Sequence, residues 1–121
     1  MRYSAAMPML VYKIAPATLW REAEAAGVFH GAPVDLADGF IHFSTAAQVR
    51  ETATKHFSGQ ADLLLVAVAA DRLGPALKYE VSRGGALFPH LYAPLDLSAV
   101  AWVKALPLGP DGAHLFPDLA A

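Results

Sequence analysis

The sequence contains no cysteine among its 121 residues. Disulfide bonds, thiolate metal sites and a cysteine nucleophile are therefore excluded. Charged residues are also scarce, at 17% of the chain, and nine Lys and Arg stand against eleven Asp and Glu, giving a formal net charge of −2. No basic run is present, so general binding to nucleic acid is not expected.

Long hydrophobic runs are lacking as well. The longest apolar stretch, residues 63–70, is far shorter than the roughly 20 residues that a membrane-spanning helix needs. Residues 1–8 have no continuous apolar segment of the kind found in a secretory leader. We therefore expect a cytoplasmic protein that does not enter a membrane.

The chain is rich in hydrophobic residues, which make up 55% of it. This composition supports a buried core, and the length is typical of one domain. We predict a single domain over residues 1–121, with a loose N-terminal leader at residues 1–8 and a C-terminal tail at residues 109–121.

Short apolar runs bounded by Pro and Gly predict six strands, at residues 9–14, 40–44, 63–70, 77–81, 87–92 and 100–106. Residues 63–70 are apolar at every position, which is typical of a strand covered on both faces. Pro89 interrupts residues 87–92 and favours an edge strand or a bulge there.

Two helices are predicted between the strands. The first covers residues 18–26 and ends at Gly27. The second begins at Thr45, which forms a capping-box pattern with Gln48. Its apolar stripe at helical spacing consists of Ala46, Val49, Ala53 and Phe57.

The segment between these helices, residues 28–39, contains Gly31 and Pro33 and is predicted to be mostly loop, with a short turn near residues 34–37. The order of the elements predicts an α+β fold with a mixed or antiparallel sheet and helices packed against it.

His42 is the first residue that is a candidate for chemistry. Strand side chains alternate, so His42 and Ser44 share one face if Ile41 and Phe43 point to the core. That face lies at the start of a helix, where free backbone N–H groups suit a phosphate. The alternative is a structural histidine beside a helix cap formed by Ser44 and Thr45.

The second group of candidates is Arg83, Gly84, Phe88, His90 and Tyr92. A guanidinium clamps phosphate or carboxylate, and glycine lets a ligand approach the backbone. The aromatic rings offer a face for stacking on a planar ligand. The alternative is a Gly-rich connection whose aromatic residues belong to the core.

No dedicated metal motif such as HExxH is present, and no metal is expected. A metal site formed by His42, His90 and a carboxylate such as Asp38 stays open as an alternative, and it would make the protein a metal-assisted hydrolase.

Two blocks, Gly39-Phe-Ile-His-Phe-Ser-Thr45 and Arg83-Gly-Gly-Ala-Leu-Phe-Pro-His-Leu-Tyr92, together resemble a family of short bacterial proteins known only as a domain of unknown function. The resemblance runs from about Leu10 to Pro117. It implies a fold similar to that of the ADP-ribosyltransferases, in which a sheet is split around a cleft that binds NAD.

The resemblance to these transferases also implies roles for single residues. Lys13 stands where many of them carry His or Arg, and His42 stands at the aromatic position beside nicotinamide. His90 takes the place of the usual catalytic Glu, which stabilises positive charge in the transition state. Glu80 is a substitute for that Glu if it reaches the cleft.

The function expected from the resemblance is binding of NAD or a related nucleotide, with ADP-ribosyl transfer or RNA 2′-phosphate transfer as the reaction. His42 orients the ribose or nicotinamide, and His90 bonds the ribose or acts as an acid or base. The cofactor-binding residues are Lys13, Ser44, Thr45, Arg83, Gly84, Phe88 and Tyr92. The alternative is a non-enzymatic module that binds a nucleotide, a metabolite or a protein on the same fold, so whether the protein is an enzyme stays open.

Overall fold

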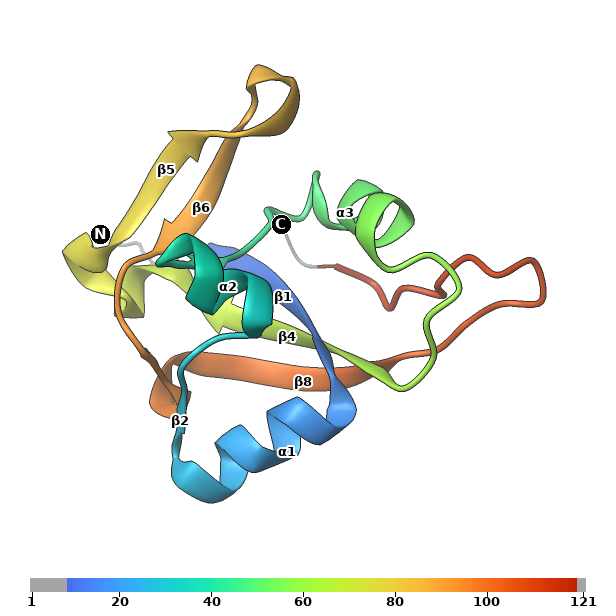
Figure 1. The fold of residues 1–121 in the computed structure, drawn as a ribbon, viewed down its shortest axis with the longest axis horizontal. Helices are drawn as coiled ribbons and strands as arrows, with labels where there is room; N and C mark the ends of the chain where they lie inside the picture. Colours follow the sequence, from blue (N-terminus) through green and yellow to red (C-terminus); the bar gives the residue numbers. More distant parts are fainter. Residues whose placement is uncertain (1–8, 120–121) are drawn as a thin grey trace, which may run out of the picture.

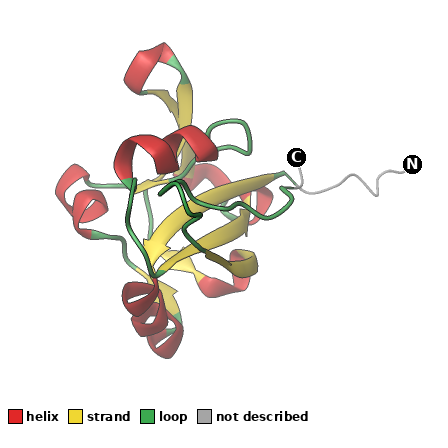
Figure 2. Ribbon diagram, turned by 90° about the vertical axis from the view of Figure 1, so that its right-hand side faces the viewer, coloured by secondary structure: helices red, strands yellow, loops and turns green. Residues whose placement is uncertain are grey.

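The computed structural model describes residues 9–119, apart from the side chain of Arg83. The leader predicted at residues 1–8 and the last two residues of the predicted tail lie outside this description. Figures 1 and 2 show the arrangement of the described elements.

Three antiparallel sheets contain all eight strands of the described part of the chain. The first sheet has the order β1 (Leu10–Pro16), β4 (Leu63–Ala69) and β8 (Val100–Leu106). The second has the order β3 (Ile41–His42), β6 (Leu87–Leu91) and β5 (Leu77–Val81). The third is the short pair β2 (Val28–Phe29) and β7 (Leu95–Asp96).

Three α-helices and four short 3-10 helices complete the described fold. The α-helices are α1 (Ala17–Ala26), α2 (Pro33–Asp38) and α3 (Val49–His56). The 3-10 helices are η1 (Ala70–Arg72), η2 (Gly74–Ala76), η3 (Arg83–Gly85) and η4 (Leu97–Ala99). The predicted α+β class with antiparallel sheets is confirmed. In the side view, the hairpin of β5 and β6 projects from the body of the molecule, with η3 at its tip (Figure 2).

The first sheet is covered on both faces, as the apolar run at residues 63–70 predicts. Alternate residues of β4 enter different cores, with Val66 and Val68 on one side and Leu65 and Ala67 on the other. The first core also contains Trp20 of α1, Phe29 of β2, Ile41 of β3, Leu91 of β6 and Leu95 of β7. The second core contains Tyr12 and Ile14 of β1, Val49 and Ala53 of α3, and Leu106 of β8.

Pro89 decides how the two large sheets meet. Its carbonyl oxygen accepts a hydrogen bond of 3.0 Å from the Phe43 N–H, but Pro89 has no N–H to donate in return. The pairing of β3 with β6 therefore ends after His42 and His90. The chain then turns to β1, where Ser44 and Tyr12 exchange hydrogen bonds of 2.8 and 2.9 Å.

The prediction that Pro89 marks an edge strand or a bulge is wrong. β6 lies between β3 and β5, with regular pairing on the β5 side. A central strand accommodates this proline because its missing donor falls where the ladder to β3 stops.

The helix predictions were correct in part. α1 ends at Gly27, which adopts φ +81°, as expected. α2 is a full helix in the segment predicted to be mostly loop. α3 begins at Val49 rather than at Thr45, because the extended backbone of Ser44 is held against β1. The capping box is half formed, since the Thr45 N–H donates to Gln48 Oε1 at 3.0 Å.

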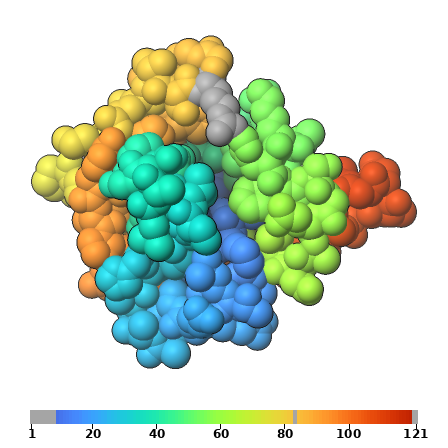
Figure 3. Space-filling view, in the orientation of Figure 1, coloured from blue at the N-terminus to red at the C-terminus, as the bar shows by residue number. Residues whose placement is uncertain are grey.

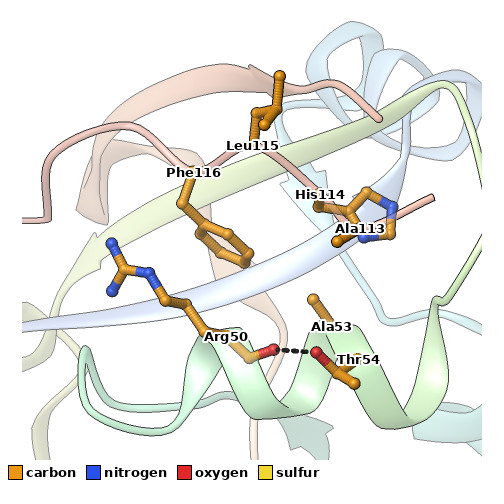
Figure 4. Close-up of a pocket in the computed structure, with 7 residues that line it drawn as sticks. All are labelled: Arg50, Ala53, Thr54, Ala113, His114, Leu115 and Phe116. Atoms are coloured by element: carbon orange, nitrogen blue, oxygen red, sulfur yellow. Dashed lines mark hydrogen bonds between the residues drawn. The ribbon is translucent and has the colours of Figure 1, made fainter. Parts of the chain in front are cut away.

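The segment predicted as a tail folds back against α3. Leu108 and His114 form a bridge, and His114 Nε2 lies 2.8 Å from the carbonyl oxygen of Gln60. Phe116 packs against the second core, with the guanidinium of Arg50 5.2 Å from its ring centre (Figure 4). His114 and Phe116 are therefore part of the packed domain.

No helix among residues 9–119 is both long and apolar enough to cross a bilayer.

Truncation of the Phe116 ring tests the stabilising role of this segment. We expect Phe116→Ala to lower the free energy of unfolding by about 1–2 kcal/mol, less than for a fully buried ring. Leu115→Ala is the matched control because Leu115 is 55% exposed, and it should change the value by less than about 0.5 kcal/mol. Urea denaturation followed by circular dichroism measures both, and equal effects would contradict the assignment.

Candidate functional site

Asp35 carries a buried carboxylate, and the residue is only 2% exposed. Lys13 Nζ of β1 lies 2.9 Å from Oδ1 and 2.8 Å from Oδ2. The backbone N–H groups of Ala32 and His42 donate to Asp35 at 2.7 and 3.1 Å. His42 Nδ1 lies 2.6 Å from Oδ1. One carboxylate therefore joins β1, α2 and β3.

The local sequence explains how Asp35 reaches these partners. It is the third residue of α2, from which an acidic side chain reaches back to the free N–H at the helix start. Gly31 packs directly against it, since a Cβ atom on Gly31 would lie 2.8 Å from Asp35 Cβ. Gly31 also has φ +124°, a conformation that other residues rarely adopt.

Electrostatics favour the ionised form of Asp35. Burial alone would raise the pKa of its carboxyl group, but the hydrogen bond from His42 and the charge and hydrogen bond of Lys13 lower it to about 2. Burial lowers the pKa of Lys13, and Asp35 opposes that shift. The pair is thus a buried salt bridge in which each charge depends on the other.

His42 is held on both sides of its ring. Nδ1 meets Asp35, and Nε2 lies 3.0 Å from Oδ2 of Asp38 at the end of α2. Ile41 and Phe43 are buried in the first core, as predicted, and the His42 side chain is 32% exposed. The alternation predicted for this strand is confirmed.

His90 lies directly opposite His42 in the pairing of β3 with β6, and the two ring centres are 5.6 Å apart. The His90 side chain is 6% exposed, and its Nδ1 lies 2.8 Å from Glu80 Oε1 on the neighbouring strand β5. Tyr92 donates to the same oxygen at 2.7 Å. Hydrogen bonds from Tyr92 and His90 lower the pKa of Glu80, which favours its carboxylate form.

Phe40 connects the two histidines. Its ring stacks on His90 with centres 4.1 Å apart and lies 4.6 Å from the ring of His42. The ring of Tyr92 also packs against Phe40, with the ring centres 5.2 Å apart. The two imidazoles therefore belong to one aromatic cluster at the start of β3.

A cavity of about 560 Å³ opens in front of the two histidines. It is bounded by β1 and by residues of α2, α3 and the β5–β6 hairpin, and the space-filling view shows the hollow between α2 and α3 (Figure 3). Of the predicted site residues, Lys13, His42, Ser44, Phe88 and His90 line it. The volume is within the range of sites for small ligands.

The other predicted residues lie elsewhere. Thr45 binds Gln48 beside the start of α3, Gly84 is at the hairpin tip with φ +68°, and Tyr92 faces Phe40 and Glu80. None of these three lines the cavity. The backbone of Arg83 is part of η3, but its side chain lies outside the described residues. Lys13 is a partner of Asp35 and not a free cation.

Sequence reasoning missed Asp35 and Phe40. A lysine inside an otherwise apolar strand was the available signal, because a buried Lys13 needs a carboxylate partner. The pattern Pro33-Val-Asp35, with an acid at the third position of a helix, pointed to the partner. Phe40 was missed because nothing in the sequence indicates that it packs on an imidazole rather than in the core.

Within residues 9–119, no group of three His, Asp or Glu residues has an arrangement that could hold a metal ion. The carboxylate oxygens nearest to His42 already bond its two ring nitrogens.

Comparisons with known proteins identify the family. Residues 14–103 match the family described as "Protein of unknown function (DUF952)". The chain belongs to this family. The predicted resemblance to a family of unknown function is confirmed. Among curated proteins, no relative matches.

Solved structures extend this result over most of the chain. The crystal structure of protein CC0527 from Caulobacter crescentus is 54% identical, with a TM-score of 0.85, over 88% of this chain and 93% of that one. A solution NMR structure of CC0527 is 55% identical, with a TM-score of 0.79, over 86% and 90% of the two chains. The fold of this chain is thus similar to that of an experimentally determined structure.

Loss of the buried ion pair is expected to destabilise the protein strongly. Asp35→Asn leaves Lys13 buried without a counter-charge, which typically costs about 3–5 kcal/mol of unfolding free energy. Asp38→Asn is the control, because Asp38 is about half exposed, and should cost less than about 1 kcal/mol. The double variant Lys13→Met, Asp35→Asn should lose less than the sum of its single variants. Additive effects in chemical denaturation would contradict the pairing.

The same carboxylate predicts a dependence of stability on pH. Its pKa is about 2 in the folded protein, against an ordinary value of 3.8. Its contribution is therefore complete above about pH 4 and is lost as the pH falls towards 2, by an amount on the order of 2 kcal/mol. Unfolding midpoints measure this loss when they are recorded from about pH 2 to about pH 6, which covers the titration of the Asp35 carboxyl group. Asp35→Asn should lack it, and parallel curves for the two proteins would refute the assignment.

Proposed function

We propose that the cavity binds a nucleotide, with NAD as the first candidate, and that the protein acts in ADP-ribosyl transfer or the related transfer of an RNA 2′-phosphate. The observation that carries this proposal is the pairing of His42 with His90 on adjacent strands, both facing the same cavity. The His90 imidazole can hydrogen-bond a ribose, whose hydroxyl groups both donate and accept hydrogen bonds, and the His42 ring lies 5.6 Å from it.

The shape of the fold supports the proposal. The pairing of β3 with β6 ends at Pro89, and the chain then joins β1, so the two large sheets diverge where the cavity lies. A sheet that opens around a ligand is what the resemblance to ADP-ribosyltransferases implies. In this chain the opening is lined by residues of both sheets, including Lys13 and His90.

The chemistry of the lining also supports a nucleotide. Phe40 and Phe88 offer aromatic surface for a planar ring, as aromatic side chains do in many nucleotide sites. Ser44 and Thr52, whose hydroxyl oxygens are 2.8 Å apart, offer hydrogen bonds to sugar hydroxyls. Lys55 of α3 also lines the cavity, where it pairs with Glu51 at 3.5 Å and can offer its charge to a phosphate.

Calorimetric titration of the full chain with NAD tests the proposal. We expect saturable binding that weakens at least about tenfold, equivalent to 1.4 kcal/mol, in His42→Ala and in His90→Ala. His30→Ala is the matched control, since His30 is exposed and lies outside the cavity, and it should bind as the wild type does. Circular dichroism checks that all three variants are folded.

Chromatography of the same mixtures then separates enzyme from binding module. Release of nicotinamide would identify a transferase or a hydrolase of NAD. Binding without release, with all plausible acceptors present, would favour the non-enzymatic module. No saturable binding at millimolar NAD would refute the nucleotide proposal.

A further inference from the structure

The two histidines of the cavity differ in how many ring nitrogens are engaged. His42 contacts a carboxylate through each nitrogen, Asp35 at Nδ1 and Asp38 at Nε2. His90 contacts Glu80 through Nδ1, and none of the contacts among the described side chains involves its Nε2. The residue therefore has one ring nitrogen for a ligand, whereas His42 has both occupied by the protein.

We infer that His90 is the general base of the cavity, that Glu80 is its positioning residue, and that the group it activates is a hydroxyl compound. This inference deepens the proposed function and rests on it for the identity of the substrate. It also separates the roles of the two histidines. His90 takes part in turnover, while His42, whose two ring nitrogens are held by carboxylates, forms part of the cavity wall beside it.

The partner of Nδ1 determines the tautomer of His90. An ionised carboxylate only accepts hydrogen bonds, so the ring nitrogen that faces Glu80 must carry the hydrogen. In a neutral ring, Nε2 then holds the lone pair and can take up a proton. A carboxylate that orients an imidazole in this way activates side-chain nucleophiles in many unrelated enzymes.

Two further contacts hold the Glu80–His90 dyad in place. Tyr92 donates to the Glu80 oxygen that faces His90, which keeps that carboxylate turned towards β6. Phe40 stacks on the face of the His90 ring, with an angle of 27° between the planes. Glu80 itself does not line the cavity, so it acts on a ligand through His90.

This geometry indicates the class of acceptor. A hydroxyl group is a weak nucleophile until a base removes its proton, so a free imidazole nitrogen is useful with water or an alcohol. In the step that follows, the hydroxyl oxygen forms a bond to C1′ of the nicotinamide ribose, and its proton passes to His90 Nε2. The bond from C1′ to the nicotinamide nitrogen breaks, and nicotinamide leaves with the bonding electron pair.

Nitrogen-15 NMR of the histidine rings tests the dyad without any ligand. We expect the neutral His90 ring to carry its hydrogen on Nδ1, the tautomer that unconstrained imidazole disfavours. Glu80→Leu should convert it to the Nε2–H form, because leucine removes the oxygen that accepts from Nδ1–H. Tyr92→Phe is the control, since it keeps the Glu80 carboxylate, and should leave the Nδ1–H tautomer in place.

Nicotinamide release from NAD provides the second measurement. Glu80→Leu should reduce the rate by roughly 100-fold or more, because Nε2 of His90 then carries the hydrogen and cannot act as the base. NAD affinity should change by less than about threefold, because Glu80 does not line the cavity. Methanol added to the reaction distinguishes the acceptors. A methyl ADP-riboside indicates that alcohols enter the site, and ADP-ribose alone indicates water.

The outcomes separate this inference from the proposed function. An Nε2–H tautomer for wild-type His90, or full activity in Glu80→Leu, would overturn the assignment of the base. The expected tautomer and its switch in Glu80→Leu, with no binding of NAD, would support the dyad and overturn the nucleotide as its substrate. The expected tautomer together with a slow Glu80→Leu variant supports both.

Discussion

The structure around the cavity depends on the burial of one carboxylate. A charge that is almost completely removed from water is tolerated only when its hydrogen-bonding capacity is filled, and Asp35 fills it with two side chains and two backbone N–H groups. These partners belong to β1, β3 and the start of α2. Because one group satisfies all of them, the positions of these elements are not independent.

The second constraint is a missing hydrogen-bond donor. Pro89 stops the ladder between β3 and β6, and the freed backbone at residues 43–44 pairs with β1. A sheet that would otherwise continue is thereby divided, and the place of division is where Lys13, His42 and His90 come together. The ion pair of Lys13 and Asp35 connects the two sheets at this point, and Pro89 allows them to separate there.

Much of the secondary structure was predictable from the sequence, because local patterns of apolar and polar residues reflect interactions between near neighbours in the chain. The alternation of buried and exposed residues around His42 and the apolar run of β4 were interpreted correctly. Pro89 was misjudged, since whether a proline is tolerated in a central strand depends on where a neighbouring strand ends. The link from Glu80 to His90 likewise depends on the register in which β5 pairs with β6, which the sequence alone does not give.

The packing of Phe40 against the His90 ring has a consequence for ligand affinity. An imidazole fixed by a stacked ring, a carboxylate and a neighbouring strand has little rotational freedom left to lose when a molecule binds. Immobilising a flexible side chain on binding commonly costs about 0.5–1.5 kcal/mol. In this protein that entropy is given up during folding instead, so contacts to His90 contribute to affinity with little offset.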